Sequence, residues 1–133
     1  MKKLLLPLLL ILIGCSEPDG PFKTYYEDRY ENDHLKEEGT YKDGYLDGPY
    51  KSYHENGQIY YETTYKDGKP DGLWKTYHEN GQLHHDINYK DGKRDGPTRF
   101  YNLNGQLEIE DTYKDGELID SKEYDESGQL TVE

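Results

Sequence analysis

Histidines are the residues of this sequence that invite a metal-binding hypothesis. Five are present, including His54 and His78, which lie 24 residues apart, and the adjacent pair His84 and His85. In the strands expected below, His54 and His78 are two strands apart, about 10 Å, and adjacent residues point to opposite faces. No three histidines then converge at the roughly 2 Å that zinc ligation requires. We expect no metal site and no cofactor.

Carboxylates and serines are the other candidates for chemistry. Each full repeat contains two Asp-Gly dipeptides, which begin at Asp67 and Asp71 in one of them. The sequence has no Asp-x-Asp-x-Asp-Gly loop followed by a distal Glu, and tight turns themselves prefer Asp-Gly, so turns are favoured over calcium sites. Within the repeats, Ser52, Ser121 and Ser127 lack a Gly-x-Ser-x-Gly context. We expect no catalytic residues and no enzyme activity.

A 24-residue repeat positions these side chains. The tyrosines that open the repeated "YKDG" are Tyr41, Tyr65, Tyr89 and Tyr113. The repeated glycines are Gly44, Gly57, Gly68, Gly72, Gly81, Gly92, Gly96, Gly105 and Gly116. An earlier copy begins at Asp19, and the last copy is degenerate, with Asp120 where glycine is expected. A fixed period of this kind indicates a repeat architecture with atypical terminal copies.

Each repeat is predicted to form a β-hairpin. Asn-Gly between alternating runs favours a two-residue type I′ turn. With Asn80-Gly81 as that turn, Lys75 lies opposite Asp86, Trp74 opposite Ile87, and His78 opposite Leu83. The same register places Lys51 opposite Glu62 and Arg99 opposite Glu110, so a basic residue meets an acidic one in every full hairpin. A bulged three-residue turn would separate these partners, which favours the two-residue turn.

The resulting sheet has one apolar and one charged face. The apolar face is predicted to carry Leu35, Ile59, Leu83, Leu107, Tyr50, Tyr61, Trp74, Ile87, Phe100 and Ile109. The opposite face carries Lys, Glu, Asp and Thr, as in an antiparallel sheet with one wet side. We therefore predict an all-β protein, an elongated single-sheet antiparallel meander of about ten strands, curled around its aromatic face.

The N-terminal segment resembles a bacterial lipoprotein signal. Lys2 and Lys3 precede an apolar run too short to span a bilayer, and the run closes with Leu12-Ile13-Gly14-Cys15. This resemblance implies a signal peptide at residues 1–14 and lipid attachment at Cys15, the only cysteine. Residues 15–18 would form a tether and residues 19–133 the repeat domain. The location expected is the bacterial envelope, with the outer membrane favoured because Ser16 rather than Asp follows Cys15.

Composition limits the partners. Without Lys2 and Lys3, the chain has 14 basic and 28 acidic residues, a formal charge of −14. Such a protein is repelled by nucleic acid and by anionic headgroups. Only 32% of residues are hydrophobic and 15 residues are tyrosine, which suits a thin, half-buried sheet better than a thick core.

The stretch "YKDGKPDGLWKTYHENGQL", Tyr65 to Leu83, resembles the MORN-repeat variant family, and the similarity covers about residues 19–128. The resemblance implies a repeat module rather than an enzyme. Similar family members are described as antitoxins of toxin–antitoxin systems, and related MORN repeats as scaffolds or membrane-associated modules. A lipid anchor departs from the pattern of a cytosolic antitoxin.

We therefore expect a non-catalytic envelope lipoprotein that binds another protein, either as a scaffold or as an immunity-type protein whose partner is a toxin. The partner-binding face is predicted at Tyr50, Tyr61, Trp74, Ile87, Phe100 and Ile109, because Tyr and Trp are common interface anchors. Packing alone also accounts for an aromatic face of this kind. The alternative function is glycan or cell-wall binding, through aromatic hairpins faintly similar to choline-binding repeats.

Overall fold

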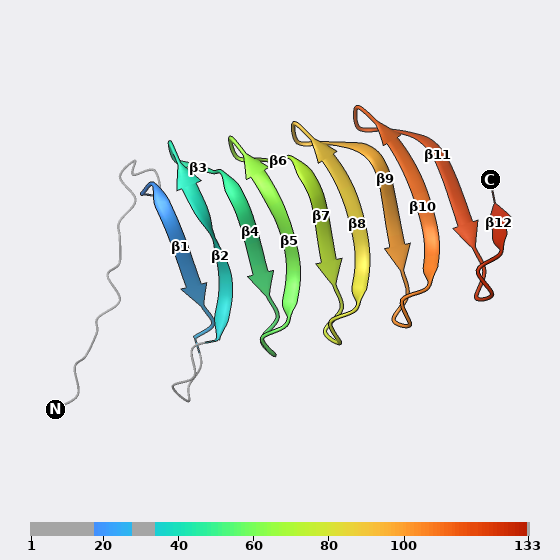
Figure 1. Cartoon of the computed structure of the whole chain (residues 1–133), viewed down its shortest axis with the longest axis horizontal. Coiled ribbons are helices and arrows are strands. Elements are labelled where there is room, and N and C mark those ends of the chain that lie inside the picture. Colours follow the sequence, from blue (N-terminus) through green and yellow to red (C-terminus); the bar gives the residue numbers. More distant parts are fainter. Residues whose placement is uncertain (1–17, 28–33, 133) are drawn as a thin grey trace.

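The computed structural model describes residues 18–27 and 34–132, which form a single antiparallel β-sheet (Figure 1). The strands are β1 (Gly20–Tyr25), β2 (Leu35–Lys42), β3 (Tyr45–Leu46), β4 (Gly48–Tyr53), β5 (Ile59–Lys66), β6 (Lys69–Pro70), β7 (Gly72–Tyr77), β8 (Leu83–Lys90), β9 (Lys93–Tyr101), β10 (Leu107–Lys114), β11 (Glu117–Tyr124) and β12 (Leu130–Val132). Within these residues there is no helix that could cross a membrane.

The sheet is a meander. Ten strands succeed one another in chain order, from β1 at one end to β12 at the other, and the two-residue strands β3 and β6 pair with β2 and β5 (Figure 1). In the next repeat the corresponding short strand merges with its successor, so β9 is nine residues long. The predicted all-β meander of about ten strands is confirmed, and the sheet stays open rather than closing on itself.

The first Asp-Gly step of each repeat, in the "YKDG" motif, forms a two-residue turn. Lys66 pairs with Lys69 across Asp67-Gly68, whose φ angles are 50° and 76°. A type I′ turn needs positive φ at both central residues, which glycine adopts freely and Asp tolerates. Positive φ recurs at the equivalent Asp43, Asp91 and Asp115. The "YKDG" motif is therefore the type I′ hairpin signal of this chain.

Asn-Gly steps form a different turn from the one predicted. The Gly81 amide donates to the His78 carbonyl at 2.8 Å, and the His78 amide donates to the Gln82 carbonyl at 2.8 Å. These bonds enclose a three-residue loop, residues 79–81, in which Gly81 has a φ of 83°. The Asn80 side chain accepts a hydrogen bond from the Gln82 amide at 2.9 Å, which explains the asparagine. The prediction of a type I′ turn at Asn80-Gly81 is wrong.

A β-bulge compensates for the longer turn. Tyr77, not His78, lies opposite Leu83, and the register then shifts so that His84 has no opposite residue. The turn and the bulge displace the register in opposite senses, so the predicted pairs beyond the bulge are restored. These confirmed pairs are Lys75–Asp86, Trp74–Ile87, Lys51–Glu62 and Arg99–Glu110.

The bulge also changes the face of four apolar residues. Leu35, Ile59, Leu83 and Leu107 lie opposite Tyr25, Tyr53, Tyr77 and Tyr101, respectively. Directly opposite residues share a face, and the hydroxyls of Tyr53 and Tyr77 reach glutamates of the charged face. The prediction that these four residues join the aromatic face is therefore wrong.

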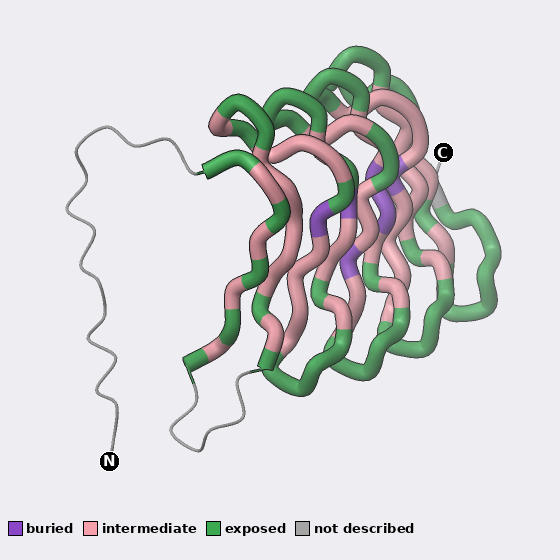
Figure 2. The backbone as a smooth tube through the Cα atoms, turned by 60° about the vertical axis from the view of Figure 1, so that its left-hand side comes forward, coloured by how far each residue is buried: buried purple, intermediate pink, exposed green. Residues whose placement is uncertain are grey.

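Burial is confined to the middle of the strands, whereas the turns at both ends are exposed (Figure 2). Among the described residues, the buried apolar side chains are Tyr50 and Ile87, which are 6% and 5% exposed. Thr98, opposite Ile87, is fully buried. No second sheet or helix covers the described strands, so side chains of the sheet bury one another.

Candidate functional site

The aromatic face is a continuous row of ring contacts across the N-terminal half of the sheet. Tyr50 on β4 stacks on Tyr61 on β5, with ring centroids 5.5 Å apart and planes inclined by 21°. Tyr61 stacks on Trp74 of β7 at 4.6 Å and 9°. Aromatic pairs at these distances add to the energy of area burial. The row thus links side chains of three strands whose backbones are also joined by hydrogen bonds.

This row continues toward both ends of the sheet. Phe22 on β1 lies 6.3 Å from the Tyr50 ring, and Tyr89 on β8 lies 6.1 Å from Trp74. Further along, the Arg94 guanidinium lies 5.1 Å from the centre of the Tyr113 ring and donates to its hydroxyl at 3.2 Å. Sequence reasoning missed Arg94, although it occupies the repeat position of Pro70.

The predicted partner-binding residues divide into two groups. Tyr50 and Ile87 are buried by their neighbours and offer little surface to a partner. Tyr61, Trp74, Phe100 and Ile109 are half-buried, and no other described element covers them. The Trp74 Nε1 donates to the Thr76 hydroxyl at 3.1 Å, so its polar group is satisfied within the sheet.

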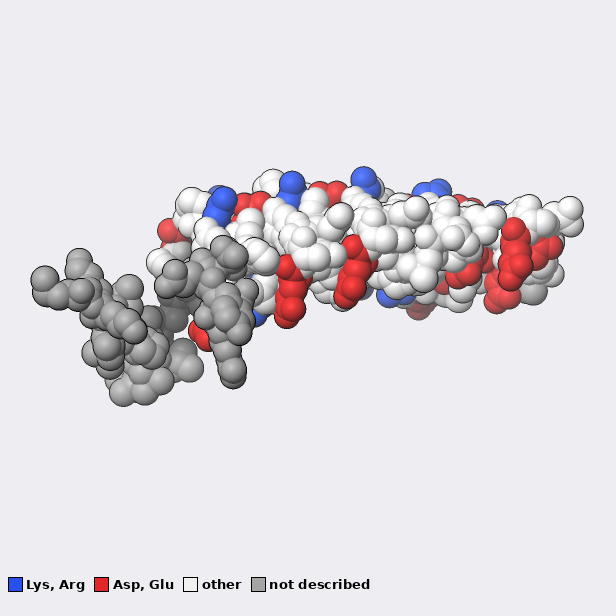
Figure 3. All heavy atoms as spheres, turned by 90° about the horizontal axis from the view of Figure 1, so that it is seen from below, with Lys and Arg blue, Asp and Glu red and all other residues white. Residues whose placement is uncertain are grey.

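Residues of alternating charge form a ladder across the opposite face, with one residue on each of nine strands. We call it the charge ladder, and its members in order are Lys23, Glu38, Lys51, Glu62, Lys75, Asp86, Arg99, Glu110 and Lys122. Each is in register with the next. Viewed from the edge, the sheet is a thin slab (Figure 3). The sequence predicted the pairs within hairpins, whereas the pairs between hairpins emerged only from the sheet.

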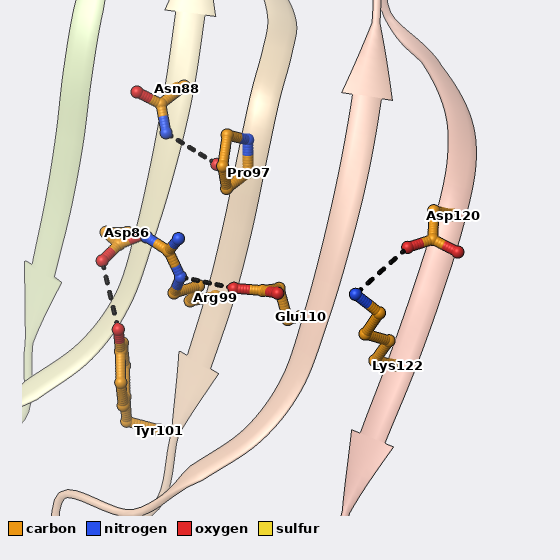
Figure 4. Close-up of polar contacts among 8 residues, drawn as sticks. All are labelled: Asp86, Asn88, Pro97, Arg99, Tyr101, Glu110, Asp120 and Lys122. Carbon is orange, nitrogen blue, oxygen red and sulfur yellow. Dashed lines mark hydrogen bonds and ion pairs between the residues drawn. The ribbon is translucent and has the colours of Figure 1, made fainter. Parts of the chain in front are cut away.

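Arg99 makes the tightest contacts of the charge ladder (Figure 4). Its Nε is 2.7 Å from a Glu110 oxygen and its Nη1 is 3.7 Å from Asp86 Oδ1. The hydrogen bond to Glu110 raises the pKa of Arg99. The Tyr101 hydroxyl donates to Asp86 at 3.3 Å, so the buried Asp86 has a cation on one side and a hydroxyl on the other.

Tyrosine hydroxyls also engage the acids of the N-terminal half of the ladder. Tyr53 donates to Glu38 at 2.6 Å, and Tyr77 donates to Glu62 at 2.8 Å. Burial, followed by these hydrogen bonds, raises the pKa of Tyr53 and of Tyr77 to about 12. Glu38 and Glu62 thus each accept a hydrogen bond from a neutral hydroxyl, which satisfies a carboxylate oxygen without neutralising its charge.

The repeat pattern agrees with a known family. Compared with protein families, the chain matches the MORN repeat variant at residues 29–43, 46–67, 70–91 and 94–115, more than half of its length. The chain belongs to the MORN repeat variant family. Searches of curated proteins and of solved structures gave no significant match. MORN repeats are in general repeat modules that bind proteins or membranes.

Strands outside the family match extend the MORN sheet. β1 precedes the first matched repeat, and β11 and β12 follow the last one. β1 pairs with β2 in the register of a hairpin, with Lys23 opposite Glu38. The degenerate first and last copies expected from the sequence are thus built into the same sheet, which supports reading them as its terminal units.

Acids at the Asp-Gly edge bind the backbone of the next MORN repeat. Asp71 accepts a hydrogen bond from the Asp91 amide at 3.3 Å, and Asp95 accepts one from the Asp115 amide at 3.2 Å. The Asp115 amide, followed by Lys114, lowers the pKa of Asp95. Among the described residues no group of three potential ligands could hold a metal ion. The second Asp of each repeat has a structural partner that accounts for its presence.

Histidines link neighbouring turns at the other edge. The ring of His54 is 3.1 Å from the Tyr77 carbonyl, and that of His78 is 3.4 Å from the Tyr101 carbonyl. The His84 ring lies near the rings of both His78 and His85, with centroids 4.3 Å and 4.9 Å apart. Burial lowers the pKa of His85. His84 and His85 were expected to point apart, and the bulge brings their rings together without creating a metal-ligand set in the described part of the chain.

The serines considered for catalysis make local contacts. Ser52 donates to the Lys36 carbonyl at 3.4 Å, and Ser121 donates to Asp111 at 2.6 Å. Ser127 donates to Asp125 within its own turn. Cys15, the predicted lipid-attachment residue, lies outside the described residues, as does the whole segment 1–17.

Proposed function

We propose that this chain is a non-catalytic envelope protein that binds another protein through its aromatic face. The observation that carries the proposal is the row of half-buried rings, including Tyr61 and Trp74, on a face that no other described element covers. Large rings left at the surface of a rigid sheet are efficient interface anchors, because little side-chain entropy is lost on binding.

Ring geometry favours a protein partner over a glycan. A sugar platform needs an aromatic ring whose flat face is free, but the planes of Tyr61 and Trp74 are stacked on each other at 4.6 Å. Tyr61 is also stacked on Tyr50, so both of its faces are occupied and its edge is left for a partner. Glycan or cell-wall binding remains the alternative function. For a protein partner we propose one of two roles, a scaffold in the envelope or an immunity-type function against a toxin.

Photocrosslinking tests this proposal. A photoreactive phenylalanine analogue at Tyr61 should crosslink to one protein in cells, whereas the same analogue at Leu103, which is 63% exposed in the turn between β9 and β10, should not. For the protein identified, Trp74→Ala should weaken binding by about 2 kcal/mol, the loss typical of an anchor residue. Leu103→Ala is the control, because Leu103 lies in a turn outside the aromatic face. Unchanged affinity of the folded Trp74→Ala protein would show that the ring serves packing only, and crosslinks to murein would favour the glycan alternative.

The lipid anchor is a separate part of the proposal. Leu12-Ile13-Gly14-Cys15 supports cleavage before Cys15 and acylation of its thiol. The tether of residues 15–18 would reach about 14 Å at most, which would keep β1 near the headgroups. Because the charge of −14 opposes an anionic surface, the sheet would project away from it, with an outer-membrane location preferred. Replacing Cys15 with Ala should give an uncleaved chain without fatty acid. Equal labelling of variant and parent by an acyl probe contradicts the anchor.

A further inference from the structure

Two shallow grooves lie on the charged face, one repeat apart. The second groove has a volume of about 230 Å³ and extends across three strands, with β5 as its floor and β4 and β7 as its walls. Its polar and apolar lining is Pro49, Lys51, Glu62, Thr64, Leu73 and Lys75. The first groove, about 370 Å³, follows β2 and has the same plan, with Glu38 and Thr40 on its floor. The same shallow groove therefore occurs in two successive repeats.

Each groove has an apolar end and a cationic end. In the second groove, Pro49 and Leu73 stand on either side of Thr64, and Lys51 and Lys75 stand on either side of Glu62, because residues two apart in a strand share a face. Leu73 is 42% exposed. A ligand with both an aliphatic part and negative charges would match this lining.

The two lysines are less engaged than the other cations of the charge ladder. Lys23 lies 3.2 Å from Glu38, and Arg99 contacts two acids. In the described part of the chain neither Lys51 nor Lys75 has an ion pair within 4 Å. Their shared neighbour Glu62 instead accepts a hydrogen bond from Tyr77. These two half-buried lysines are separated by two strand spacings, about 10 Å, and have no ion pair within the described residues.

We propose that the charged face binds an acidic segment of a partner protein in polyproline II conformation, with one carboxylate at Lys51 and another at Lys75. A segment lying across the strands must place two carboxylates on one side, about 10 Å apart. A polyproline II chain has three residues per turn and rises about 3.1 Å per residue, so residues i and i+3 are about 9.3 Å apart on the same side. A β-strand would turn residue i+3 to the other side.

Conformation also favours this occupant energetically. A polyproline II segment has no internal hydrogen bonds to break, and proline restricts the free chain, so little entropy is lost when it binds. The apolar ends of the grooves, at Pro49 and Leu73, would contact the proline rings between the carboxylates. This surface is on the face opposite the aromatic face, so its test does not depend on the partner proposed above.

Synthetic peptides provide the test. The probe is a labelled, capped peptide in which Glu alternates with two prolines, Glu-Pro-Pro-Glu-Pro-Pro-Glu, measured by fluorescence anisotropy with the full chain at low ionic strength. Peptides with Gln in place of Glu, or with the glutamates adjacent to one another, should bind about five- to tenfold more weakly, because each exposed ion pair contributes modestly. Equal binding of the peptide with adjacent glutamates would contradict the proposed spacing.

Matched variants locate the site. Lys51→Gln with Lys75→Gln should weaken binding of the probe about five- to tenfold. Lys66→Gln with Lys90→Gln removes the same net charge from exposed positions outside both grooves and should change binding by less than about twofold. Thermal unfolding of both variants checks their folding. Equal losses in the two double variants, or no binding of the probe to the parent, would overturn the proposal.

Discussion

Single residues have their clearest effect at the Asp-Gly turns, where backbone angles restrict the side chain. Gly68 has a φ of 76°, and a methyl group at its α-carbon would lie 3.0 Å from the Tyr45 ring. We predict that Gly68→Ala lowers the free energy of unfolding by about 1–2 kcal/mol, because the left-handed region is unfavourable for alanine. Asp67→Asn, the control, should leave stability nearly unchanged, because Asn also tolerates positive φ. Urea unfolding of both variants measures this, and equal losses would argue against the turn assignment.

Ionisation of Tyr53 is a second prediction at this scale. Its folded pKa of about 12 exceeds the ordinary value of 10.0, so its contribution to stability is complete below pH 10 and disappears as the pH rises through about 12. Its partner Glu38 has a lowered pKa, chiefly because of this hydrogen bond and then Lys23. The Glu38 contribution is present above pH 4.5 and disappears as the pH falls through the folded pKa.

The test is an ultraviolet titration of tyrosinate in the folded protein. Subtracting the Tyr53→Phe curve from the parent curve should reveal a group that ionises near pH 12. The same subtraction in urea should give a value near 10. A difference curve centred near 10 in the folded protein would mean that the contact with Glu38 does not form.

The register of each Asn-Gly hairpin depends on a three-residue turn combined with a β-bulge. We predict that deletion of His84 is tolerated, with a loss of about 1 kcal/mol, because Thr76–His85 and Tyr77–Leu83 become consecutive pairs of a regular ladder. Deletion of Asp86 should instead cost about 4 kcal/mol or more, because it moves the side chains on one side of the gap to the wrong face. Circular dichroism and thermal unfolding compare the two. Equal stability of both deletions would refute the bulge as a register device.

The whole sheet behaves as a stack of units that contact only their neighbours. Deleting residues 65–88 removes one complete repeat and joins Thr64 to Tyr89 in phase. We predict a folded protein of somewhat lower stability, because the stability of such stacks is approximately a sum over neighbouring units. Deleting residues 65–76 should abolish folding, because the following strands would then run in the opposite direction. Thermal unfolding measures the difference, and similar melting curves would contradict modularity.

At the scale of the fold, much was predictable from the 24-residue period. The antiparallel meander, the charge pairs such as Lys51–Glu62, and the composition of the aromatic row all follow from local alternation repeated at a fixed spacing. The turn at Asn80-Gly81 was not predictable, because Asn-Gly suits both a type I′ turn and a three-residue turn ending in a positive φ. The two errors, turn length and missing bulge, cancelled at Lys75–Asp86 but misplaced Leu83.

The sequence by itself determined the repeat, the hairpins and the alternation of charge within each hairpin, because these depend on residues close together in the chain. Only the tertiary structure decided how one hairpin meets the next. The register partners Glu38–Lys51 and Glu62–Lys75 join separate hairpins and extend the alternation of charge into one ladder across the sheet. The burial of Tyr50 and the groove between Lys51 and Lys75 likewise depend on side chains from three strands. Their positions follow from the register across each connection, which the local Asp-Gly turn does not set alone. Lys66 pairs with Lys69 across that turn, whereas Glu62 pairs with Lys75, so the register shifts by two residues where hydrogen bonds join β5 to β7.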